Sequence, residues 1–185
     1  MESLQGQLLV ASSSLTDPNF AGTVVLVAVH GEDGALGLIL NRELATTVQE
    51  VWSQVSKTQS VRLENVRHGG PVRGTLMALH DRRAFANLVI GQGVYLSTEL
   101  NAMESLSTSH EGSVIFYLGH SGWGPGQLEN ELNEGSWLLL PATADYVFGE
   151  LDSGAVWKLA MNQVGRRELH SLVPIKHIPD DPRAN

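Results

Sequence analysis

The sequence predicts an α+β fold in a single domain spanning residues 1–185. Short apolar runs bounded by Gly, Pro, Asn or Asp recur along the chain, as is typical of strands. Segments with helical periodicity are fewer and do not alternate regularly with these runs, which disfavours a doubly wound parallel sheet. No linker, low-complexity tract or internal repeat divides the chain. We therefore expect one core at about 6–165 and an irregular tail at 171–185.

The first strands are expected at 8–11, 24–29 and 35–40. A turn or helix start at 17–20 precedes the second, because Pro18 fixes its own φ. Every residue from Val24 to Val29 is apolar, a pattern typical of a strand buried on both faces. The turn residues at 30–34 then predict a hairpin with the next strand.

A helix is expected at 46–55, where four apolar residues share one face: Val48, Val51, Trp52 and Val55. Two capping boxes are available for its start, Thr46 with Gln49 and Thr47 with Glu50. The Gly-Gly-Pro sequence within 67–71 predicts a tight loop after it.

Further strands are expected at 75–80, 86–90, 93–97, 114–118 and 137–140, and further helices at 98–107, 126–134, 143–148 and 155–164. Gly135 and Gly165 follow two of these helices, at the position where glycine often ends a helix. Pro141 ends the last strand, and three prolines after Ser171 predict the irregular tail.

Composition restricts the function classes. The net charge is −8, which disfavours a protein dedicated to coating nucleic acid. The absence of cysteine excludes disulfides, thiolate nucleophiles and Cys-based zinc sites. No apolar run approaches the length of a membrane span, and the first residues do not resemble a signal peptide. A cytoplasmic protein without membrane contact is expected.

The charge is unevenly distributed. Five arginines and two acids give residues 62–83 a net charge of +3, whereas residues 84–165 carry nine acids and Lys158 alone. The arginines are interpreted either as solvated surface charges or as an anion site for phosphate, nucleotide or a nucleic-acid backbone. Direct DNA binding through 62–83 is accordingly one alternative function.

The run from Gly119 to Glu129, Gly-His-Ser-Gly-Trp-Gly-Pro-Gly-Gln-Leu-Glu, is the most distinctive stretch of the chain. Its first five residues nearly match the nucleophile elbow G-x-S-x-G. Trp123 stands where that motif requires glycine, so the match is incomplete. A hydrolase using Ser121 and His120 is a second alternative function.

The same run also has the context of an anion cradle, because glycines lead from a strand into a helix start. Pro125 removes one backbone donor from that loop, and Glu129 in the first turn would oppose an anion. The competing interpretation is a rigid corner with Trp123 packed beneath it. The seven histidines show no metal-ligand spacing, so neither a metal nor a cofactor is expected.

Several segments carry a resemblance, in order along the chain: 8–11, 17–20, 34–38 with His30, Asn41-Arg42, Gly69-Gly70-Pro71-Val72, 93–96, 114–129, and Trp137 with Pro141-Ala142. With these segments, from about Gly6 to Gly165, the sequence resembles the AlgH/YqgE-like family. The family commonly has Tyr and Ala where this chain has His120 and Ser121, and Pro where it has Glu43.

The resemblance implies one α+β domain whose mixed sheet is bent or bifurcated into a barrel-like core with flanking short helices. It also implies a bacterial cytoplasmic protein that has no assigned reaction, in a family whose members are described as candidate transcriptional regulators. Alanine at the place of Ser121 in relatives disfavours this serine as a family nucleophile.

The expected function is therefore a regulatory or binding protein that recognises a small ligand or a protein partner, and an enzyme is disfavoured. No catalytic residue is assigned. The candidate ligand-binding residues are Asn41, Arg42, Gly69, Gly70, His120, Trp123 and Gln127. An arginine at a rigid strand end, such as Arg42, can present a bidentate fork to a carboxylate or phosphate.

Overall fold

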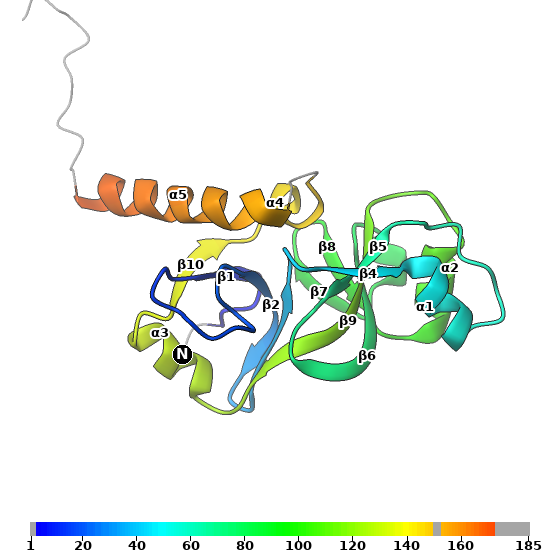
Figure 1. The fold of residues 1–185 in the computed structure, drawn as a ribbon, viewed down its shortest axis with the longest axis horizontal. Helices are drawn as coiled ribbons and strands as arrows, with labels where there is room; N and C mark the ends of the chain where they lie inside the picture. Colours follow the sequence, from blue (N-terminus) through cyan, green and yellow to red (C-terminus); the bar gives the residue numbers. More distant parts are fainter. Residues whose placement is uncertain (1–2, 150–152, 173–185) are drawn as a thin grey trace, which may run out of the picture.

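One ten-stranded sheet, curled into a half-barrel and flanked by short helices, forms the fold (Figure 1). The computed structural model describes residues 3–149 and 153–172. The elements are β1 (Gln7–Ala11), β2 (Val24–Gly31), β3 (Gly34–Ile39), β4 (Glu43–Thr47), α1 (Val48–Val55), β5 (Asn65–His68), β6 (Val72–His80), the 3-10 helix η1 (Arg83–Phe85), β7 (Leu88–Gly91), β8 (Val94–Ser97), α2 (Leu100–Ser107), β9 (Val114–Trp123), α3 (Gln127–Asn133), β10 (Trp137–Pro141), α4 (Ala144–Phe148) and α5 (Ser153–Leu172). The α+β class and the barrel-like sheet are confirmed.

The strand order is β10-β1-β2-β3-β9-β6-β8-β7, and the sheet branches at β9. Strand β6 pairs antiparallel with β9 from Val114 to His120. The other edge of β9 pairs first with β5, in the one parallel match of the described sheet, and then with β3. The backbone N–H of Ile39 donates to Gly69 O at 3.0 Å, which joins the end of β3 to the loop after β5. The sheet is therefore mixed.

Strands β1 and β2 bury both of their faces, as predicted for 24–29. Residues Val24 to Ala28 are all 0% exposed, and the strand becomes more exposed from Val29, at 44%, to its end at Gly31. Alternate residues face two different cores, because successive strand side chains point to opposite sides. One core is shared with α4 and α5, and the other with Trp123, Leu128 of α3 and Trp137.

Helices α1 and α2 lie at the opposite end of the molecule from α5 (Figure 1), over a third core built on β5, β6 and β9. Helix α1 uses the second of the two capping boxes. The Thr47 N–H donates to Glu50 Oε2 at 2.8 Å, and the Glu50 N–H donates to Thr47 Oγ1 at 3.2 Å. The apolar face of α1 is buried through its residues Val48, Val51 and Trp52, whereas Val55 at the end of the helix is exposed.

Strands β4 and β5 are not in the sequence prediction. The segment 43–47 was expected to be partly helical and 67–68 to be loop, but Glu43 pairs with Arg67 and Thr47 with Asn65 across the two strands. Neither strand is apolar enough to be recognised alone, and each is stabilised by a partner distant in sequence. Helix α1 accordingly begins at Val48.

The prediction that Gly165 ends the last helix is wrong. Helix α5 continues through Gly165 to Leu172, so the first two residues of the predicted tail are helical; residues 173–185 lie outside the described part. Glycine inside a helix costs only about 1 kcal/mol. The packing of Val156, Ala160 and Val164 on the sheet outweighs that cost. Within the described residues, no helix is long and apolar enough to cross a membrane.

Candidate functional site

The first part of the glycine stretch lies at the branch of the sheet and is not a loop. Residues 119–123 belong to β9, contrary to the prediction that this strand ends at Leu118. A Cβ on Gly69 would lie 2.1 Å from Gly119 O, and a Cβ on Gly70 would lie 2.3 Å from Ser121 N. Both glycines are buried. Glycine is needed here because any side chain would collide with the neighbouring backbone.

The serine in this stretch does not have the geometry of a nucleophile. Ser121 is 0% exposed, and its Oγ donates to Gly69 O at 3.2 Å. A nucleophile needs a histidine within hydrogen-bond reach, and the hydroxyl is instead bound to a carbonyl. His120 Nδ1 is buried without a hydrogen-bond partner among the described residues. Burial also lowers the pKa of His120, which favours the neutral ring.

Trp123 belongs to an aromatic cluster that shares one carboxylate. The indole N–H groups of Trp123 and Trp137 both donate to Glu131 Oε2, at 2.9 and 2.8 Å. Gln127 Nε2 donates to Glu131 Oε1 at 2.9 Å, and Gln127 Oε1 accepts from the Gly124 N–H at 3.1 Å. The Trp123 ring is 5% exposed. This geometry supports the rigid-corner interpretation of the glycine stretch, with the corner itself at 124–126.

The anion-cradle interpretation gains no support from the first turn of α3. The Glu129 carboxylate lies there and pairs with His30 Nε2 at 2.9 Å. Helix α3 has only seven residues, so its dipole is short. The first turn of α3 therefore already holds the Glu129 carboxylate, which would repel a bound anion.

Asn41 and Arg42 hold the loop before β2. Asn41 Oδ1 accepts from the Val24 N–H at 2.9 Å, and Asn41 Nδ2 donates to Gly22 O at 2.9 Å. Arg42 Nη2 donates to Ala21 O at 3.0 Å. Asn41 is 8% exposed, so it is a buried structural amide.

The seven predicted site residues therefore lie in three neighbourhoods. Gly69, Gly70 and His120 come together at the sheet branch. Trp123 and Gln127 lie at the corner leading into α3, and Asn41 with Arg42 lies against the 21–22 loop. None of the seven lines either of the two cavities that stand out in the described part of the chain.

The arginines of 62–83 are largely engaged within the molecule. Arg62 is 5% exposed, and its Nε donates to Leu106 O at 2.9 Å. Arg67 Nη1 donates to Leu40 O at 2.8 Å. Arg82 pairs with Glu111 at 3.2 Å and lies over the Phe85 ring at 4.6 Å. A continuous basic face for nucleic acid gains no support from these contacts.

His80 is the most deeply buried described histidine, at 0% exposure. The Arg82 N–H lies 3.3 Å from His80 Nδ1, and His80 Nε2 lies 2.8 Å from Ser97 Oγ. Because Nδ1 accepts, Nε2 carries the proton of a neutral ring. Ser97 Oγ then donates to Phe85 O. The ring therefore joins β6, β8 and η1.

Acidification is expected to destabilise the fold partly through His80. Burial lowers its pKa, so the unfolded chain takes up this proton more readily than the folded one. Stability is then lost as the pH falls below about 6.5. His80→Gln should weaken the pH dependence of the unfolding free energy between about pH 7 and pH 5, as measured by urea denaturation. The exposed control His110→Gln should keep the wild-type slope, and an equal slope for His80→Gln would contradict the expectation.

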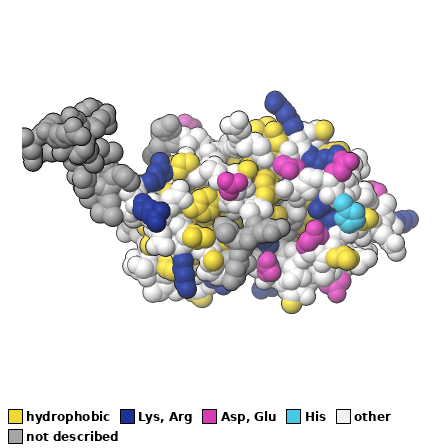
Figure 2. All heavy atoms as spheres, turned by 90° about the horizontal axis from the view of Figure 1, so that it is seen from above, with side chains coloured by type: hydrophobic (Ala, Val, Ile, Leu, Met, Phe, Trp, Pro, Cys, Tyr) yellow, Lys and Arg dark blue, Asp and Glu magenta, His cyan; other side chains and the backbone are white. Residues whose placement is uncertain are grey.

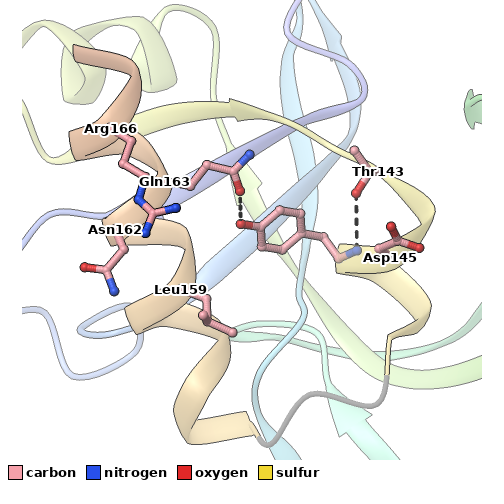
Figure 3. A pocket seen from close by; sticks show the side chains of 7 residues that line it. Thr143, Asp145, Leu159, Asn162, Gln163 and Arg166 are labelled. Carbon is pink, nitrogen blue, oxygen red and sulfur yellow. Dashed lines mark hydrogen bonds between the residues drawn. The ribbon is translucent and has the colours of Figure 1, made fainter. Parts of the chain in front are cut away.

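An open site lies between α4 and α5 (Figure 3). It is a cavity of about 640 Å³ lined by seven residues: Thr143, Asp145, Tyr146, Leu159, Asn162, Gln163 and Arg166. The Tyr146 hydroxyl donates to Gln163 Oε1. Burial raises the pKa of Tyr146, so the hydroxyl stays protonated as a donor.

Sequence reasoning missed this cavity. The predicted helix ended at Val164, so Arg166 lay outside that helix. One helix face nevertheless carries four of the lining residues at the usual spacing: Leu159, Asn162, Gln163 and Arg166. Seen from above in Figure 2, Lys and Arg side chains lie toward both ends of the molecule. Lys158, Arg166 and Arg167 are all exposed on α5.

A second cavity of about 220 Å³ lies beside the start of β9 and is lined by Glu43, Val48, Glu64, Asn65, Arg67, Val114, Ile115 and Phe116. It falls below the usual 300–1,000 Å³ range of small-molecule sites. The α4–α5 cavity falls within that range and is therefore the stronger candidate.

Comparisons with known proteins establish the family. A family model described as AlgH-like matches residues 8–168. A UPF0301 protein of Stenotrophomonas maltophilia (strain R551-3) is 37% identical over 170 residues, which cover 88% of this chain and 90% of that protein. The chain belongs to the AlgH-like family. A UPF0301 protein of Xanthomonas oryzae pv. oryzae (strain PXO99A) is also 37% identical, over 169 residues that cover 88% of this chain and 89% of the relative.

Solved structures agree with membership of the AlgH-like family. The solution structure of the AlgH protein from Pseudomonas aeruginosa matches with a TM-score of 0.73 and 28% identity, covering 95% of this chain and 96% of AlgH. A crystal structure of a Corynebacterium diphtheriae protein matches with a TM-score of 0.68 and 21% identity, covering 88% and 87% of the two chains, and shows the shared fold. The names of these relatives identify no reaction, so the function must be inferred from the site itself.

Proposed function

We propose that this AlgH-like protein is a regulatory binding protein that takes a small polar ligand between α4 and α5. The observation that carries the proposal is the cavity of about 640 Å³, whose size fits a small molecule. Its walls offer a carboxylate, a guanidinium, two amides and a phenol. Convergent polar groups of this kind fix a ligand's orientation.

The geometry of α5 suggests how binding would be transmitted. The first part of the helix is anchored on the sheet through Val156 and Ala160, and Trp157 Nε1 donates to Ala11 O at 2.7 Å. Arg166 and the residues after it lie beyond this anchor. A ligand that contacts both helices adds binding energy to their docked arrangement and so favours it over alternatives. A protein partner that reads the position of α5 would respond to the ligand.

The relatives compared above are bacterial proteins, which supports placing this function in a bacterial cell. We include a cytoplasmic location in the proposal, as the family resemblance implies.

A thermal-shift screen against polar metabolites and nucleotides tests the proposal. A ligand that binds only the folded state raises Tm, by an amount equivalent to about 2.7 kcal/mol at a hundredfold excess over Kd. The variant Asn162→Trp places a large ring at an exposed lining position and should abolish the shift. Lys158→Trp, at an exposed position of α5 outside the lining, is the matched control and should keep it.

Two results would overturn the proposal. One is a screen in which no compound raises Tm. The other is a Tm shift of equal size in wild type and Asn162→Trp, which would place the ligand elsewhere on the molecule.

A further inference from the structure

The α4–α5 cavity has opposite charges at its two ends. Arg166 extends from α5 at one side of the cavity, and Asp145 lies at the opposite side, at the start of α4 (Figure 3). Neither side chain forms an ion pair with another described residue: the described carboxylates that contact a basic side chain are Glu64, Glu111 and Glu129, which bind Arg62, Arg82 and His30. Both charges are therefore available to a ligand.

The groups between these charges suit an uncharged, partly aliphatic body. Tyr146 lines the same cavity, with its hydroxyl bound to Gln163 Oε1. Leu159 is 43% exposed and supplies apolar surface in the same cavity. Burying aliphatic carbon against such surface is favourable.

We propose that the ligand is a zwitterion whose carboxylate and ammonium groups are separated by a chain of several bonds, as in an ω-amino acid. The carboxylate binds the Arg166 guanidinium, whose planar fork donates two parallel hydrogen bonds to the two carboxylate oxygens. The ammonium binds the Asp145 carboxylate, and the chain between them lies against Tyr146 and Leu159. This inference rests on the proposed function, because it uses the same cavity.

Charge complementarity excludes simpler ligands from tight binding. A plain carboxylate would satisfy Arg166 but leave Asp145 facing the same cavity with a like charge, and a plain amine would do the reverse at Arg166. An α-amino acid carries both charges on one carbon, so it can satisfy only one end at a time. Separation of the two charged groups is thus the feature that the cavity selects.

A series of ligands of increasing length tests the inference. Glycine, γ-aminobutyrate and ε-aminocaproate are titrated into the full chain and followed by isothermal calorimetry and by NMR. Caproate and hexylamine, each lacking one charged group, are the matched ligands. Affinity should rise from glycine to the longer zwitterions, and each one-charge ligand should bind at least about tenfold more weakly than ε-aminocaproate.

Variants of Arg166 and Asp145 test which charged group of the ligand binds at each end of the cavity. Arg166→Gln should bind ε-aminocaproate no better than hexylamine, and Asp145→Asn should bind it no better than caproate. The double exchange Arg166→Asp with Asp145→Arg should restore binding, because the ligand can bind in the opposite direction. Lys158→Gln removes an exposed charge of α5 outside the cavity and should leave affinity unchanged.

Two outcomes would overturn this ligand class, and they differ in what they leave standing. If caproate or hexylamine binds as tightly as ε-aminocaproate, and Asn162→Trp blocks that binding, the cavity is a ligand site but not for separated zwitterions. If neither this series nor the metabolite screen gives binding that Asn162→Trp abolishes, the proposed function falls as well.

Discussion

Replacing Gly119 with alanine is expected to lower the free energy of unfolding by about 2–5 kcal/mol. Gly119 lies within β9 with a φ of +74°, where a Cβ would stand 2.6 Å from Val72 O and 3.0 Å from Gly70 O. The left-handed conformation costs a non-glycine residue roughly 1–2 kcal/mol. Forcing a methyl group against backbone adds roughly 1–3 kcal/mol, because neither carbonyl can move without breaking the sheet branch. Urea denaturation followed by tryptophan fluorescence measures the loss.

Gly122 provides the matched control in the same strand. A Cβ there would meet Val72 Cγ2 at 3.6 Å, which is ordinary contact, and its φ is not left-handed. Gly122→Ala should therefore stay within about 0.5 kcal/mol of wild type. If Gly119→Ala proved as stable as Gly122→Ala, the close approach of the strands at the branch would be refuted.

The sequence predicted local features better than contacts between segments that are distant in sequence. The α1 cap depends on Thr47 and Glu50, three residues apart, and the apolar run at 24–29 indicates a doubly buried strand by itself. The branch depends on Gly69 approaching Gly119. Each glycine cluster is visible in the sequence, but a pattern within either cluster carries no information about which distant backbone it will approach.

For the candidate site too, local sequence features were recognised, whereas a cavity formed by the packing of two helices was not. The predicted residues were chosen because they stand out along the chain. In the structure, Asn41, Arg42 and Gln127 bind neighbouring backbone groups, and Gly69 and Gly70 allow the close approach of two segments. The cavity is lined mostly by polar residues of α4, its N-cap and α5, and it exists because Val156 and Val164 pack on the sheet. Helix packing of this kind overrides the local signal of Gly165, which in isolation favours a helix end.

Removing the Glu131 carboxylate is expected to lower the free energy of unfolding by about as much as Gly119→Ala does. Glu131→Ala leaves the indole N–H groups of Trp123 and Trp137 without their shared acceptor, on side chains that are 5% and 2% exposed. An unsatisfied buried donor costs about 1–3 kcal/mol. Two of them should lower the free energy of unfolding by about 2–6 kcal/mol, and the tryptophan emission of the folded protein should change.

Glu131→Gln separates the loss of an acceptor from the loss of a charge. Both indoles donate to the same oxygen, Oε2, and an amide oxygen has two lone pairs with which to replace it. The variant loses mainly the bond from Gln127, so it should retain most of the stability that Glu131→Ala loses. Exposed Glu134 supplies the control Glu134→Ala, expected within about 0.5 kcal/mol of wild type. Equal losses in Glu131→Gln and Glu131→Ala would show that the charge of Glu131, rather than its role as a shared acceptor, stabilises the corner.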